Sequence, residues 1–138
     1  MTTLDDETRV AIDAVTALRL VREDPSIGVR RRLVAPVALR SHVLSMLYRE
    51  VRDGSLGETD ARAQVEALAA LKVRLLGDRV SRATAWRIAR QLDLDDTALA
   101  EYLAVATLQA DMLVAGDPTI AAAADGIVEL ADHGDLLG

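Results

Sequence analysis

The sequence predicts one α/β domain, a three-layer α/β/α sandwich with a mostly parallel central sheet. Short apolar runs of strand length alternate with segments of helical periodicity, which is typical of a parallel sheet covered on both faces. The length of 138 residues is that of about one domain, and 51% hydrophobic residues are enough for an independent core. We therefore treat residues 1–138 as one domain, with a core from about 9 to 130 and a frayed tail over 131–138.

In the first half of the chain, apolar runs and stop signals predict two strands and three helices. Pro25, directly after Asp24, ends the first helix, and Gly54 ends the second. Pro36 suits the first turn of a helix, because the N–H that proline lacks has no partner there anyway. The expected strands are 9–13 and 33–35, and the expected helices are 14–23, 36–53 and 58–71.

The second half continues the alternation with three strands and three helices. Gly77 and Asp78 mark a turn after a short apolar run, and Ser81 is expected to cap the helix that follows. Asp95 and Asp96 offer caps for the next helix. The expected strands are 73–76, 112–115 and 127–130, and the expected helices are 81–92, 97–109 and 118–124.

Composition and charge exclude several classes of function. The net charge of −6 argues against bulk electrostatic attraction to nucleic acid, and the basic run Arg30–Arg32 is interpreted as a solvated loop. With no cysteine, the chain has no disulfide, zinc–thiolate site or cysteine nucleophile. No apolar run approaches the roughly 20 residues of a membrane span, and the acidic N-terminus lacks a signal-peptide pattern. We therefore expect a cytoplasmic protein without a membrane partner.

Two of the predicted strands are each followed by an aspartate and then by a helix. Asp13 follows Val10-Ala11-Ile12, and Asp117 follows Leu113-Val114-Ala115-Gly116. If both strands belong to one parallel sheet, both carboxylates lie at the edge where open α/β proteins bind ligands. Two carboxylates there indicate a divalent cation held by oxygen ligands. Taken alone, however, Asp13 is better explained as a helix N-cap than as a ligand, and Asp117-Pro118 is a common turn and cap signal.

The order and spacing of several short segments resemble the PIN-domain family, and most closely the VapC-type ribonuclease toxins of prokaryotic toxin–antitoxin pairs. The resemblance covers the chain from about Arg9 to Leu130. The segments that carry it are Ile12-Asp13-Ala14, Leu33-Val34-Ala35-Pro36, Leu39-Arg40-Ser41, Tyr102-Leu103-Ala104-Val105-Ala106 and Leu113-Val114-Ala115-Gly116-Asp117. The family binds magnesium or manganese with acidic residues at four positions, and it commonly forms homodimers.

Only two of those four acidic positions are acidic in this chain. They are Asp13 and Asp117, whereas His42 and Leu99 occupy the other two positions. Leucine cannot coordinate a metal, and imidazole suits zinc or copper better than magnesium. Asp96 offers a replacement acid from the loop before Leu99, although a capping role is the stronger interpretation. The resemblance therefore implies a metal site of Asp13 and Asp117, with His42 and Asp96 as further candidates, and weak or absent magnesium or manganese binding.

Two functions follow from the resemblance. The first is a PIN-like domain of toxin–antitoxin type with an incomplete metal site, non-catalytic or weakly active, that acts by binding protein or RNA. The second is an active ribonuclease toxin, dependent on magnesium or manganese, whose site is rebuilt around Asp13 and Asp117. The implied partners are a second copy of the chain, an antitoxin-like protein and RNA.

Overall fold

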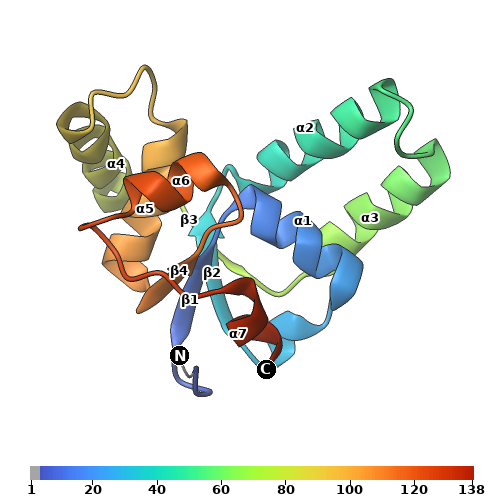
Figure 1. Ribbon diagram of the computed structural model, residues 1–138, viewed down its shortest axis with the longest axis horizontal. Coiled ribbons are helices and arrows are strands. Elements are labelled where there is room, and N and C mark those ends of the chain that lie inside the picture. The colour runs from blue at the N-terminus through green and yellow to red at the C-terminus, as the bar shows by residue number, and fades with distance from the viewer. Residues whose placement is uncertain (1–3) are drawn as a thin grey trace.

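Four parallel strands form the centre of the molecule in the computed structural model, which describes residues 4–138. The strands lie in the order β3-β2-β1-β4. This all-parallel sheet between helical layers confirms the predicted three-layer α/β/α fold (Figure 1). The strand bounds are β1 Arg9–Ile12, β2 Arg32–Pro36, β3 Arg74–Leu76 and β4 Met112–Val114.

Helices cover both faces of the sheet. The bounds are α1 Ala14–Glu23, the 3-10 turn η1 Ile27–Val29, α2 Leu39–Arg52, α3 Glu58–Ala70, α4 Arg79–Gln91, α5 Ala98–Gln109, α6 Pro118–Ala123 and α7 His133–Leu137. Right-handed crossovers from β1 to β2 and from β2 to β3 bring α1, α2 and α3 to one face, and the return to β4 brings α4 and α5 to the other (Figure 1). Within residues 4–138, no helix has the length and apolar character needed to cross a membrane.

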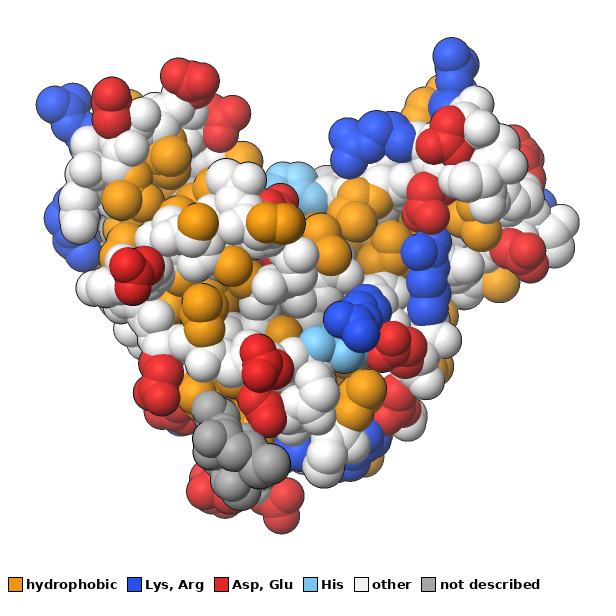
Figure 2. All heavy atoms as spheres, viewed as in Figure 1, with side chains coloured by type: hydrophobic (Ala, Val, Ile, Leu, Met, Phe, Trp, Pro, Cys, Tyr) orange, Lys and Arg blue, Asp and Glu red, His pale blue; other side chains and the backbone are white. Residues whose placement is uncertain are grey.

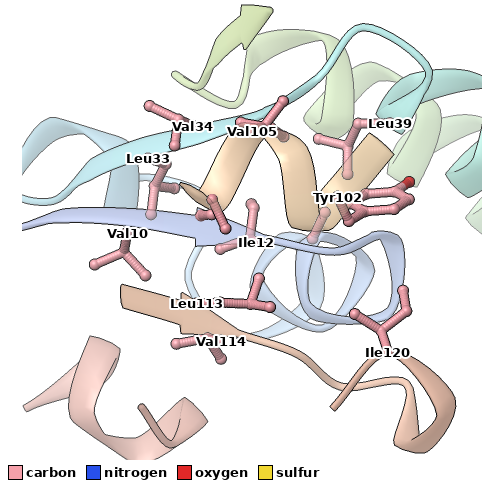
Figure 3. Packing of buried hydrophobic residues seen from close by; sticks show 14 of the residues in the cluster. Val10, Ile12, Leu33, Val34, Leu39, Tyr102, Val105, Leu113, Val114 and Ile120 are labelled. Carbon is pink, nitrogen blue, oxygen red and sulfur yellow. The ribbon is translucent and has the colours of Figure 1, made fainter. Parts of the chain in front are cut away.

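The core lies where the strands meet these two layers. Val10, Ile12 and Leu113 are fully buried, and Val34 packs on the side of the sheet that α5 covers with Val105 (Figure 3). Strands buried on both faces have nearly continuous apolar sequences rather than alternating ones. This explains why the strands are short apolar runs in the sequence.

Two helix starts differ from the prediction. Pro36 is the last residue of β2, opposite Leu76, and not the first turn of α2. The N–H of Val37 donates to the Leu76 carbonyl oxygen at 3.0 Å, so strand pairing keeps the backbone extended past the proline. Similarly, Ser81 is not the cap of α4, because Asp78 is the N-cap and accepts the Ser81 N–H at 3.1 Å.

The predicted strand over 127–130 is absent. A single β-bridge joins Leu113 to Leu130 instead. Two hydrogen bonds support it: the Leu113 N–H donates to the Glu129 carbonyl oxygen at 2.9 Å, and the Ala131 N–H donates to the Leu113 carbonyl oxygen at 2.9 Å. The segment therefore covers the free edge of β4 without extending the sheet.

The C-terminal segment is a docked helix rather than a frayed tail. Leu136 of α7 is fully buried, and the guanidinium of Arg31 holds the end of the chain. Arg31 donates to the carbonyl oxygens of Leu136 at 2.9 Å and Gly138 at 2.8 Å, and also to those of Leu4 and Asp135. The interpretation of Arg30–Arg32 as a solvated loop is therefore wrong for its central residue, which is buried.

Candidate functional site

The topology creates one crevice at the carboxyl edge of the sheet. The chain leaves β1 through α1 toward β2, whereas it reaches β4 through α4 and α5 on the opposite face. The gap beyond β1 and β4 is thus the point where the strand order reverses, the usual ligand site of open α/β sheets. Ile12 pairs with Val114 in the register, so the residues that follow these strands meet there. Asp13 and Asp117 therefore lie at one edge, as the sequence predicts.

Asp13 is a buried acceptor for three backbone N–H groups. Its Oδ1 accepts from the N–H of Thr16 at 2.9 Å and of Gly116 at 3.0 Å, and its Oδ2 accepts from the N–H of Asp117 at 2.8 Å. The residue has no exposed surface. The first of these bonds makes Asp13 the N-cap of α1. The other two bonds tie the start of α1 to the turn between β4 and α6.

Close packing around this turn leaves no room for a side chain at position 116. A Cβ on Gly116 would lie 2.6 Å from a methyl carbon of Val15. The hydroxyl of Thr16, beside Val15, is buried and donates to the Val114 carbonyl oxygen at 3.0 Å. The Thr16 hydroxyl and the Gly116 N–H are therefore both used inside the fold.

Asp117 is half-buried and is the N-cap of α6. Its Oδ1 accepts the Thr119 N–H at 2.8 Å, and Pro118 occupies the first turn of this helix. Its other carboxylate oxygen has no hydrogen-bond partner within residues 4–138. Of the two aspartates at this edge, Asp117 has the oxygen that is open to a ligand.

His42 reaches the same crevice from α2 and is bonded to a tyrosine of α5. Its Nδ1 lies 2.5 Å from the hydroxyl oxygen of Tyr102, and the two ring centroids are 5.6 Å apart. Burial, followed by the charges of Asp13 and Glu101, raises the pKa of Tyr102 far above its usual value. The phenol therefore keeps its proton, and its hydroxyl shares one hydrogen bond with Nδ1 of His42, in which the donor depends on the tautomer of the imidazole.

Leu99 and Asp96 do not line this crevice. Leu99 is half-buried and packs against the hydrophobic core. Asp96 is exposed, accepts the Ala98 N–H at 3.0 Å, and borders a different depression beside Trp86 of α4. The structure thus brings Asp13, Asp117 and His42 together and leaves Asp96 outside.

The crevice is an open cleft of about 400 Å³. Figure 2 shows the hollowed surface between the α2–α3 side and the α4–α5 side of the molecule, with hydrophobic side chains around it. The lining residues are Asp13, Ala14, Val15, His42, Ser45, Met46, Arg49, Asp117 and Ile120. Within residues 4–138, no three His, Cys, Asp or Glu side chains converge closely enough to hold a metal ion.

Sequence reasoning missed four members of this site. Ser45, Met46 and Arg49 follow His42 at offsets of three, four and seven, which place all four residues on one face of α2. That spacing was a usable signal. The sequence does not indicate Tyr102 as a site residue. Its contact with His42 joins residues 60 positions apart and therefore leaves no local pattern.

Comparison with protein-family models gives no match to this chain, and comparison with curated proteins gives none either. Among solved structures, the chain is similar to the crystal structure of PAE2754 from Pyrobaculum aerophilum, with a TM-score of 0.73 and 24% sequence identity. The superposition covers 94% of this chain and 94% of the other. This similarity is one of fold, and it extends over nearly the whole domain.

Proposed function

We propose that this chain is a PIN-like domain of toxin–antitoxin type that acts in the cytoplasm by binding a partner rather than by cleaving RNA. One observation carries the proposal: the carboxylate of Asp13 is fully buried and accepts three backbone N–H groups. A carboxylate committed in this way stabilises the fold at the position where the family resemblance implies a metal ligand.

The donor set at this edge does not fit magnesium or manganese. These ions need oxygen ligands, and magnesium demands near-octahedral geometry. Asp13 keeps at most one lone-pair site beside its three backbone N–H bonds, and Asp117 has the more open carboxylate. His42 offers a nitrogen whose ring is held by Tyr102, and Leu99 offers nothing. This donor set gives little support to metal-assisted hydrolysis, in which a bound cation activates water and neutralises the charge on a phosphate.

Exposed apolar side chains support binding of a protein partner. Leu44 and Tyr48 lie one turn apart on α2 and are 53% and 63% exposed. Trp86 of α4 is 64% exposed. Apolar surface of this kind on a small domain marks protein contacts, and closed two-fold dimers are the commonest assembly. We expect a homodimer, or a complex with an antitoxin-like protein. A monomer in light scattering at high micromolar protein concentration would contradict the homodimer.

The second candidate function is an active ribonuclease with a rebuilt site. It is favoured by the presence of Asp13, Asp117 and His42 in one cleft together with Arg49, whose guanidinium is suited to a phosphate group. The two functions differ in what magnesium or manganese does. In the first, added metal leaves RNA intact, and in the second it produces cleavage that depends on the two aspartates.

An RNA cleavage assay separates the two functions. Wild-type protein is incubated with a labelled RNA and magnesium or manganese, beside Asp117→Asn and Asp13→Asn. Asp117→Asn is the more informative variant, because the Asp117 side chain makes a single hydrogen bond within the described residues 4–138. Equal residual cleavage in all three proteins supports the binding function. Metal-dependent cleavage that both substitutions abolish would overturn it in favour of the rebuilt ribonuclease.

A further inference from the structure

A large depression lies at the opposite, amino edge of the sheet, and it is strongly basic. Its volume is about 680 Å³. Six of the 16 cationic residues of the chain line it, but only one of its 22 acidic residues, Asp6, does so. The six cationic residues are Arg9, Arg30, Arg31, Arg32, Lys72 and Arg74. We call this depression the basic cleft.

The sheet register places three of these arginines on one face of three neighbouring strands. Arg9 of β1 is directly opposite Arg32 of β2. Arg74 of β3 is opposite Val34, two positions along from Arg32 and therefore on the same face. Neighbouring strands are about 4.8 Å apart, and like charges directly opposite each other destabilise a sheet. The stability of the sheet therefore does not explain why Arg9, Arg32 and Arg74 lie side by side.

Partners within the protein neutralise the cleft only in part. Arg30 pairs with Asp24 at 2.7 Å, and Arg32 pairs with Glu7 at 3.3 Å, where both side chains are more than half exposed. Arg9, Lys72 and Arg74 take part in no ion pair within residues 4–138. The cleft thus presents an uncompensated positive charge to solvent in a protein whose net charge is −6.

The wall of the basic cleft is closely packed. Gly28 in η1 lies so near the backbone of Lys72 that a Cβ at position 28 would collide with the Lys72 carbonyl oxygen. Arg31 is buried by its four bonds to backbone carbonyl oxygens, which fixes the segment between η1 and β2. The cationic side chains therefore project from a backbone that is already in place before a ligand arrives.

We infer that the basic cleft binds a compact anion that carries two or more linked phosphate groups. Guanidinium groups are forks of donors that match phosphate oxygens, and several of them side by side suit successive phosphates. The volume lies within the range of small-molecule sites, roughly 300 to 1,000 Å³. Among the described residues 4–138, no aromatic side chain on which a base could stack lines the cleft. A long polyanion would also meet the acidic remainder of the surface, whereas a compact one would not.

This inference goes beyond the proposed function, because it concerns the other edge of the sheet and needs neither Asp13 nor Asp117. Calorimetric titration tests it with inorganic tripolyphosphate, ATP, orthophosphate and a single-stranded RNA oligonucleotide as probes. The variant Arg32→Gln/Arg74→Gln removes two cations of the cleft. Its matched control, Arg52→Gln/Arg87→Gln, removes two exposed arginines that lie outside the cleft and form no ion pair.

We expect tripolyphosphate to bind the wild type more tightly than orthophosphate, and salt to weaken binding. The cleft variant should lose about tenfold or more in affinity, while the control changes less than about twofold. If ATP and tripolyphosphate bind with equal affinity, the cleft recognises the phosphate chain alone. If ATP binds more tightly than tripolyphosphate, the cleft also contacts the nucleoside. Without ligand, the cleft variant should unfold at the same or a higher temperature, because like-charge repulsion is relieved.

Two results would overturn the inference. One is that the wild type binds neither tripolyphosphate nor ATP, or that the cleft variant binds them as well as the wild type does. The other is that the RNA oligonucleotide binds more tightly than tripolyphosphate and loses this affinity in the cleft variant, which would make the ligand a nucleic-acid strand.

Discussion

Replacing Asp13 by alanine should destabilise the protein more than any other single change at the carboxyl edge. The substitution removes the acceptor for the N–H groups of Thr16, Gly116 and Asp117, of which the first bond is buried and the others are partly buried. Loss of a helix N-cap costs about 0.5 to 2 kcal/mol. Each buried donor left without a partner costs about 1 to 3 kcal/mol, and water reaching the β4–α6 turn reduces this for two of them. We expect a total loss of about 3 to 5 kcal/mol in the free energy of unfolding.

Urea unfolding at equilibrium, followed by circular dichroism, measures this loss, because a single domain of this size is expected to unfold in one transition. The matched control is Asp117→Ala, which removes one cap hydrogen bond at a half-buried position and should cost about 1 kcal/mol. If Asp13 belonged to a metal site, Asp13→Ala would change the free energy of unfolding in the opposite direction. If Asp13 were held among like charges for an ion, its removal would relieve repulsion and leave the metal-free protein as stable or more stable. Equal or smaller destabilisation by Asp13→Ala than by Asp117→Ala would refute the reasoning.

Three further predictions concern other parts of the fold. Leu99→Asp should lower the free energy of unfolding by about 1 to 3 kcal/mol, because Leu99 packs against the hydrophobic core outside the crevice, whereas His42→Glu adds an acid to the crevice and should gain magnesium affinity; thermal unfolding with and without magnesium measures both. Arg31→Met should cost about 2 to 4 kcal/mol and release α7, so hydrogen exchange over 133–137 should accelerate selectively. Gly28→Ala should cost about 1 to 3 kcal/mol in urea unfolding, because its Cβ would collide with the Lys72 carbonyl oxygen.

The alternation of apolar runs and periodic segments was enough to predict the layers of the fold. It works here because β1, β2 and β4 are buried on both faces and each crossover contains at least one amphipathic helix. The predicted boundaries of strands and helices are wrong where a contact with a distant segment overrides a local preference. Pro36 stays in β2 because β3 pairs with the residues around it. The C-terminal segment forms α7 because Arg31, more than 100 residues earlier, holds its carbonyl oxygens.

In the candidate site, too, local features could be predicted from the sequence and contacts between distant residues could not. Both interpretations of Asp13, ligand and N-cap, were present in the sequence, and the N-cap bond could be read from the strand–helix junction. The two bonds to Gly116 and Asp117 could not, because they join residues 103 and 104 positions apart. Likewise, nothing local to His42 indicates that its Nδ1 contacts Tyr102. Such contacts depend on the strand order, which the sequence pattern left open.

Calorimetric titration of the purified protein with magnesium, at a protein concentration of roughly 100 μM, tests the central claim most directly. The carboxylate of Asp13, buried and bonded to three backbone N–H groups, predicts no binding heat above that of Asp117→Asn, in which an amide replaces the more open carboxylate at this edge. Saturable binding of one magnesium ion per chain, abolished in Asp117→Asn and in Asp13→Asn, would contradict the claim. It would mean that Asp13 and Asp117 hold the ion together.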